Sequence, residues 1–250
     1  MFVAASTACF PDLSFDDAIE RISDLEFASV EIAIHEQGNH LRPSQVAESL
    51  EMAVVTCNSV RRMDVTGFSL DFTATGEEFF HQFDRCCQLA KSVRVVSLTV
   101  PSGELGTPFN EEVEKFKRLA QIAEQHGVRV GMRSQYGRLS GDVDTVSVIC
   151  GHVKGVGLSL DPSQYIYRHE RPANFDKLLP YVQNVYLRDS NKDHLQVRVG
   201  QGVIDFGRLI TQLAQIKYNR ALVIEVLPEP DIHHFGELRK LRLLLESLLV

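Results

Sequence analysis

The chain has 250 residues, of which 44% are hydrophobic and 24% are charged, and its formal net charge is -7. This length is sufficient for one domain with a large core, and the composition is ordinary for a globular protein. The acidic balance disfavours nucleic acid as a partner, because duplex binding depends on Lys and Arg side chains that neutralise phosphates. No apolar run approaches the roughly 20 residues that span a bilayer, so we expect no membrane association.

The cysteines and the first residues of the chain bear on the cellular compartment of the protein. The five cysteines are an odd number without a CxxC spacing, which favours free thiols in a reducing environment. The first residues, MFVAASTACFP, lack the basic segment of an export signal. We therefore expect a cytoplasmic protein.

Strand-like and helix-like segments alternate along the chain. The expected strands are residues 2–5, 29–34, 53–60, 93–100, 128–132, 155–161, 182–189 and 221–227. The expected helices are residues 14–27, 43–53, 77–91, 111–127, 142–150, 175–181, 207–216 and 233–249, and residues 61–76 are expected to form a loop. Ser14 and Asp142 are candidate helix caps, Pro43 suits a first helical position, and Gly127 suits a left-handed helix end.

This alternation predicts the fold. Several strands are almost continuous in Val, Ile and Leu, as expected for strands that are covered on both faces. Alternating strands and helices give parallel strands with right-handed crossovers, and no GxGxxG follows the first strand to indicate a dinucleotide site. We predict an α/β protein in which residues 1–250 form a single (β/α)₈ TIM barrel. The sequence leaves its oligomeric state open.

Polar residues recur where the strands end. In such barrels the active site lies at the carboxyl ends of the strands. The residues at or just after these ends are Glu31, His35, Arg133, Gln135, Asp161, Gln164, Tyr186, Arg188, Asp189 and Glu225. Charged groups among aliphatic residues are costly to bury unless they are paired, so we expect these side chains to form a polar pocket.

A set of short motifs resembles a known family. The segments, in chain order, are FASVEI (27–32), GVRVGMRS (127–134), GLSLDPSQ (157–164), VYLRD (185–189), GQGVIDF (200–206) and VIEV (223–226). They resemble the motifs of the xylose isomerase-like TIM barrel superfamily, which includes sugar phosphate isomerases and epimerases. The resemblance covers essentially the whole chain. It implies a sugar or sugar phosphate isomerase or epimerase that moves a proton next to a carbonyl of a small polyhydroxylated substrate.

The chain departs from that family at the metal site. The resemblance implies a divalent metal held by Glu, Asp, His and Glu; Asp161 and Glu225 match two of these, but Arg133 and Tyr186 replace the others. A guanidinium cannot ligate, and about 4 Å from a divalent ion it would cost roughly 8 kcal/mol at an effective dielectric of 20. Two carboxylates with water would still suit a weakly held Mg²⁺. We predict instead that the metal is lost, that no cofactor is bound, and that Arg133 pairs with one or both acids.

Three functions are open for this pocket. In the first, Glu225, Asp161, Arg133 and Tyr186 are catalytic: Glu225 is the base, Tyr186 the acid, and Arg133 or Arg188 stabilises an enolate oxygen. The expected substrate-binding residues are Glu31, His35, Gln135, Gln164 and Arg188.

In the second, the barrel is inactive and either binds a sugar-like or anionic ligand or serves as an interaction scaffold. Arg133, Asp161 and Glu225 then form a buried ionic network, and Tyr186 fills the barrel mouth with its hydroxyl on a carboxylate. Glu31 is open to either role, as a catalyst or as a residue that positions its neighbours. In the third, the protein is an enzyme of another class, such as a lyase, that works without metal. The substrate is open in all three cases.

Overall fold

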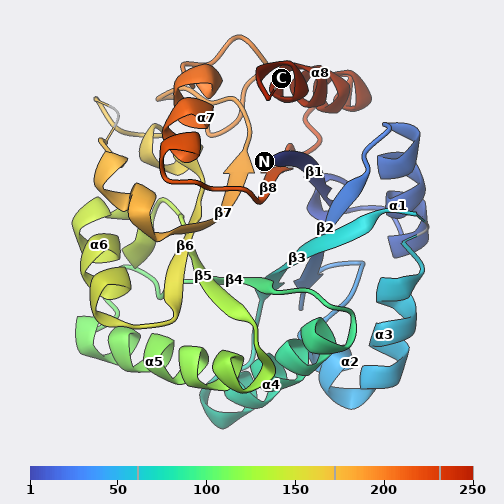
Figure 1. Ribbon diagram of the computed structural model, residues 1–250, viewed down its shortest axis with the longest axis vertical. Coiled ribbons are helices and arrows are strands. Elements are labelled where there is room, and N and C mark those ends of the chain that lie inside the picture. Colours follow the sequence, from blue (N-terminus) through green and yellow to red (C-terminus); the bar gives the residue numbers. More distant parts are fainter. Residues whose placement is uncertain (61, 172, 231, 250) are drawn as a thin grey trace.

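Parallel strands close into a barrel with helices around it (Figure 1). The computed structural model describes residues 1–60, 62–171, 173–230 and 232–249. The strands are β1 (Phe2–Ser6), β2 (Ser29–His35), β3 (Asp64–Asp71), β4 (Ser97–Pro101), β5 (Arg129–Arg133), β6 (Val156–Leu160), β7 (Val182–Leu187) and β8 (Ala221–Ile224). Each strand pairs with the next, and β1 pairs with β8 in parallel. The predicted (β/α)₈ TIM barrel is confirmed.

The helices begin and end where local chemistry favours it. They are α1 (Phe15–Asp24), α2 (Pro43–Glu48), α3 (Leu50–Asn58), α4 (Gly76–Ser92), α5 (Phe109–His126), α6 (Val143–His152), α7 (Phe206–Gln215) and α8 (His234–Leu248). The Ser14 hydroxyl accepts a hydrogen bond from the Asp17 N–H at the start of α1, and the Asp142 carboxylate accepts one from the Thr145 N–H at the start of α6. Gly127 ends α5 with a φ of 70°. The predicted helix at 175–181 is a 3₁₀ helix, η4 (Asp176–Tyr181).

The prediction of a third strand at residues 53–60 is wrong. Residues 50–58 form α3, in which Ala53 and Cys57 face the core while Met52 and Val55 are exposed. This spacing of three to four residues is helical, although Val and Thr are β-branched. The third strand lies in the segment that was expected to be a loop, of which Arg61 lies outside the described residues.

The observed third strand, β3, has buried residues from Gly67 to Leu70. It pairs with β2 over its full length and with β4 at Phe68 and Ser69. The strand β4 also begins later than expected, at Ser97, because Val93 caps α4 and Arg94 has a φ of 62°. These shifts matter for the site, because they add the end of β3 to the barrel mouth.

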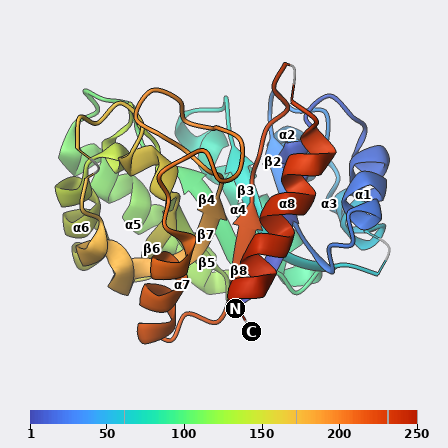
Figure 2. The same cartoon turned by 90° about the horizontal axis from the view of Figure 1, so that it is seen from above.

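The loops that follow the strands gather at one end of the barrel, at the upper edge of Figure 2. Beneath this end the barrel interior is polar as well as apolar, since Thr99 and Ser159 share a hydrogen bond of 2.7 Å there. Glu31, Asn184 and Tyr186 are also buried in the interior. None of the helices in the described ranges is long and apolar enough to cross a membrane.

Candidate functional site

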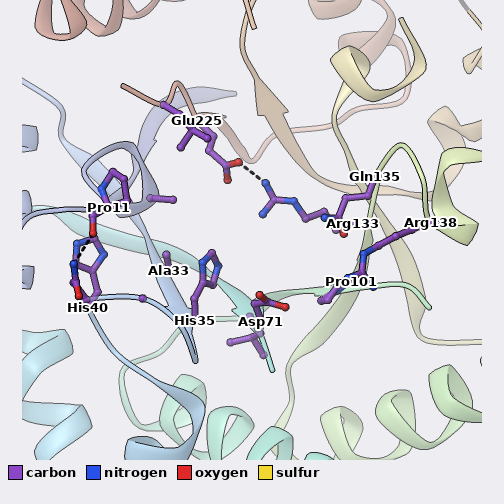
Figure 3. A pocket seen from close by; sticks show the side chains of 15 residues that line it. Pro11, Ala33, His35, His40, Asp71, Pro101, Arg133, Gln135, Arg138 and Glu225 are labelled. Carbon is purple, nitrogen blue, oxygen red and sulfur yellow. Dashed lines mark hydrogen bonds and ion pairs between the residues drawn. The ribbon is translucent and has the colours of Figure 1, made fainter. Parts of the chain in front are cut away.

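A pocket of about 340 Å³ opens at the carboxyl ends of the strands (Figure 3). Four of the predicted residues line it: His35, Arg133, Gln135 and Glu225. Arg133 ends β5 and Glu225 follows β8, and their side chains reach toward each other in Figure 3. The other six predicted residues do not line this pocket. They are Glu31, Asp161, Gln164, Tyr186, Arg188 and Asp189, and all are buried.

Two guanidiniums and two carboxylates form an ionic cluster under the pocket. Arg133 Nη2 donates to Glu225 Oε1, and Arg133 Nη1 donates to Ser69 Oγ over 3.0 Å. Arg188 Nη2 donates to the same Glu225 oxygen over 2.7 Å and to Asp161 Oδ2 over 3.2 Å. Arg133 therefore pairs with one of the two acids, whereas Arg188 bridges both. The two guanidinium charges and the two carboxylate charges of this cluster sum to zero.

Both oxygens of the Asp161 carboxylate accept hydrogen bonds from other residues of the protein. Its Oδ1 accepts hydrogen bonds from the Ser163 N–H and hydroxyl at 3.0 and 2.5 Å, which caps the 3₁₀ helix η3 (Pro162–Tyr165). Its Oδ2 accepts from Arg188 and, at 3.3 Å, from Gln164 Nε2. The Gln164 side-chain oxygen, Oε1, accepts from the Tyr136 N–H at 2.9 Å. Asp161 and Gln164 thus position the strand end and have no contact with the pocket.

Tyr186 and Glu31 form a second buried group. The Tyr186 hydroxyl and Asn184 Nδ2 both donate to Glu31 Oε1, at 2.8 and 2.9 Å. The Arg133 guanidinium lies 4.6 Å from the centre of the Tyr186 ring, in a cation–π contact. Because Arg133 lines the pocket and these residues do not, it separates them from the solvent side.

Glu31 and Glu225 differ in protonation at neutral pH: the Glu31 carboxyl is neutral and the Glu225 carboxylate is charged. Burial and, next, the charge of Glu225 raise the pKa of Glu31 to about 8, so its carboxyl is protonated. Burial would also raise the pKa of Glu225, but the charges of Arg133 and Arg188 lower it to about 2. A carboxylate with such a pKa is a weak base, which argues against Glu225 as the group that abstracts a proton.

His35 is one of two histidines in the pocket wall, the other being His40. Burial and the charge of Arg133 lower the pKa of His35, so the imidazole is neutral at neutral pH. Its Nε2 lies 3.2 Å from Ser69 Oγ, the same oxygen that accepts a hydrogen bond from Arg133. Burial and the nearby Glu31 raise the pKa of Tyr186, so its hydroxyl stays protonated.

Three buried polar atoms of the pocket residues have no hydrogen-bond partner among the described residues. They are Glu225 Oε2, Gln135 Oε1 and His40 Nε2. A buried polar atom without a partner costs on the order of 1–3 kcal/mol.

The family model for xylose isomerase-like TIM barrels matches residues 19–242. The chain belongs to this family. No curated protein sequence matches it. The chain is similar to a xylose isomerase-like TIM barrel protein from Mycobacterium smegmatis in complex with magnesium, with a TM-score of 0.78 and 14% identity over 99% of this chain and 97% of that one.

Two epimerase-type structures show the same likeness. A D-tagatose 3-epimerase-like protein has a TM-score of 0.73 and 17% identity over the whole of both chains. The 3-keto-D-glucoside 4-epimerase YcjR from E. coli has a TM-score of 0.74 and 14% identity over 99% of each chain. At these identities the likeness establishes the shared barrel.

The divalent metal that the family resemblance implies does not fit these side chains. Glu225 Oε1 is shared by two guanidiniums, and both Asp161 oxygens already accept hydrogen bonds. A cation placed there would lie beside two fixed positive charges. Across residues 1–60, 62–171, 173–230 and 232–249, no three or more His, Cys, Asp or Glu side chains are arranged to hold a metal ion.

Sequence reasoning missed several residues of the site. Ser69 and Asp71 belong to β3, and the alternation in its sequence DVTGFSLD was the signal that could have found them. Asn184 lies two residues before Tyr186 in β7, so the two share one face of the strand. Arg138 reaches the pocket from the loop after β5 and carries no sequence signal.

Proposed function

We propose that this protein binds a small polyhydroxylated, sugar-like compound in the barrel-mouth pocket without a divalent metal. The observation that carries the proposal is the pairing of Arg133 and Arg188 with Glu225, which supplies the positive charge that a metal would bring. Guanidiniums are permanently charged, and here they are nearly buried, with 14% and 4% of their side chains exposed. The epimerases of known structure with this fold support a sugar-like ligand.

The character of the wall favours a neutral ligand over a strongly anionic one. Arg133 and Glu225 present opposite charges to the pocket, and Asp71 and Arg138 add one of each sign. The unpartnered Glu225 Oε2 and Gln135 Oε1 are acceptors. Hydroxyl groups both donate and accept, so they match a wall of this mixed kind.

Metal-independent proton transfer next to a carbonyl is the second candidate function. The favouring observation is that Ser69 Oγ contacts both His35 Nε2 and Arg133 Nη1. A neutral imidazole therefore lies beside a fixed cation, so one group is suited to take a proton and the other to stabilise an enolate oxygen.

Thermal-shift measurements with pentoses, hexoses, their ketoses and phosphates, and polyols would test binding. Saturation at about 100 times Kd contributes roughly 2.7 kcal/mol, which raises the Tm by on the order of 5 °C. We expect such a shift with a neutral sugar or polyol, equal with EDTA or MnCl₂. Gln135→Ala should weaken binding about tenfold, because it removes an unpartnered acceptor. Sugar binding that requires Mn²⁺ and disappears with EDTA would refute the proposal.

Proton exchange distinguishes the two candidates. A ligand found by thermal shift is incubated in D₂O, and deuterium at the carbon next to its carbonyl is followed by NMR. Incorporation that His35→Gln abolishes, with ligand affinity retained, would favour the second candidate. No incorporation with any bound ligand would leave binding as the function.

A further inference from the structure

A second pocket adjoins the barrel mouth. It has a volume of about 460 Å³ and shares Pro101 and Arg138 with the barrel-mouth pocket. Its wall comes from the loop after β3 and the start of α4 on one side, and from the loop after β4 and α5 on the other. Pro101 and Arg138 therefore form the boundary that the two pockets have in common.

The wall of the second pocket contains three aromatic rings. Phe72 and Phe79 meet edge to face with their centroids 4.8 Å apart, and Phe79 and Phe80 do so at 5.1 Å. All three side chains are only partly buried. Partly exposed rings that are already held by their neighbours offer an apolar surface at little conformational cost.

Three charged side chains of this pocket, Glu112, Lys115 and Arg138, have partners within the protein. Glu112 accepts a hydrogen bond from the Gly103 N–H at 2.8 Å and pairs with Lys115 Nζ at 2.8 Å. Arg138 Nη1 donates to the Ser102 carbonyl oxygen at 2.7 Å. Among the described residues, none of the buried polar atoms that lack a partner belongs to this pocket.

The two adjoining pockets therefore differ in the ligand groups that would complement them. The barrel mouth has three unpartnered buried polar atoms, whereas the second pocket has aromatic rings and paired polar groups. We propose that the ligand is amphipathic, with a polyhydroxylated head in the barrel mouth and an aryl group over Phe72 and Phe79. An aryl glycoside has this chemistry. The inference rests on the proposed binding function and extends it to a ligand class.

Matched probes separate the two pockets. Benzyl alcohol tests the second pocket alone by NMR shifts of backbone amides, and methyl glycosides of the common hexoses and pentoses test the barrel mouth alone. The corresponding phenyl glycosides test both pockets together, by titration calorimetry. The variants are Phe72→Ala and Phe72→Leu, with Met52→Ala on α3 as a control for loss of an exposed apolar side chain. Circular dichroism verifies that each variant is folded.

We expect benzyl alcohol to shift the amides of Ala74, Gly76 and Gly103, and a phenyl glycoside to bind about tenfold more tightly than its methyl counterpart. Phe72→Ala should remove the higher affinity for the phenyl glycoside and leave methyl glycoside binding unchanged. Phe72→Leu should retain part of the higher affinity for the phenyl glycoside, and Met52→Ala should retain all of it. Equal affinities for both glycosides would overturn the inference and leave the proposed function standing. Benzyl alcohol shifts without binding of any glycoside would overturn both.

Discussion

Replacing Arg133 with methionine removes one of the two guanidiniums that neutralise Glu225, with little change in side-chain volume. In the wild type, a Glu225 pKa of about 2, against an ordinary value of 4.5, corresponds to about 3 kcal/mol in favour of the charged carboxylate. After the substitution, Arg188 alone faces the charges of Asp161 and Glu225. Loss of one partner from a buried ion pair costs about 3–5 kcal/mol, and we expect a loss of stability in this range at pH 7.

The pH dependence of this loss has a definite sign. The folded pKa of Glu225 is depressed, so its contribution is fully present above about pH 4.5 and is lost as the pH falls toward 2. The difference between wild type and Arg133→Met should therefore be largest near pH 7. It should shrink below pH 4.5.

Urea unfolding of the four proteins in a double-mutant cycle measures the interaction energy between Arg133 and Glu225. The cycle comprises wild type, Arg133→Met, Glu225→Gln and the double variant, and we expect a coupling energy of about 2 kcal/mol or more. Arg208→Met is the control, because its ion pair with Asp176 is exposed and such pairs contribute about 1 kcal/mol or less. Additive single effects, within about 0.5 kcal/mol, would refute the claim that Arg133 compensates the buried carboxylate.

Two further predictions concern other parts of the chain. The pKa of Glu31 is raised to about 8, so the stability that its protonated form contributes is fully present below about pH 4.5 and is lost as the pH rises to 8. Glu31→Gln keeps an acceptor for the Tyr186 hydroxyl, and it should be more stable than wild type by a few kcal/mol at pH 8 but not at pH 4.5. Urea unfolding at both pH values measures this, and a stability difference that does not change with pH would contradict it. Asp142→Ala removes the acceptor for the Thr145 N–H at the start of α6 and should cost about 1 kcal/mol in thermal unfolding, whereas an unchanged Tm would show that the cap contributes nothing.

The sequence by itself determined the barrel and the end at which its candidate pocket opens. Seven of the eight strands could be placed, because parallel strands covered on both faces are runs of aliphatic residues between helices of different period. Since all strand ends of such a barrel meet at one mouth, Arg133 and Glu225 could be expected to lie together. The third strand was misplaced, because the β-branched residues of α3 masked its helical spacing.

Only the tertiary structure decided which partner each side chain takes. Glu31 and Tyr186 are 155 residues apart in the chain, and Arg133 and Glu225 are 92 apart. Whether Asp161 is bound by Arg133 or by Arg188 depends on the closure of the barrel, which fixes the distances between strand ends. Burial likewise decides that Glu31 holds a proton while Glu225 is charged, because the cost of removing a carboxylate from water is offset only where guanidiniums contact it.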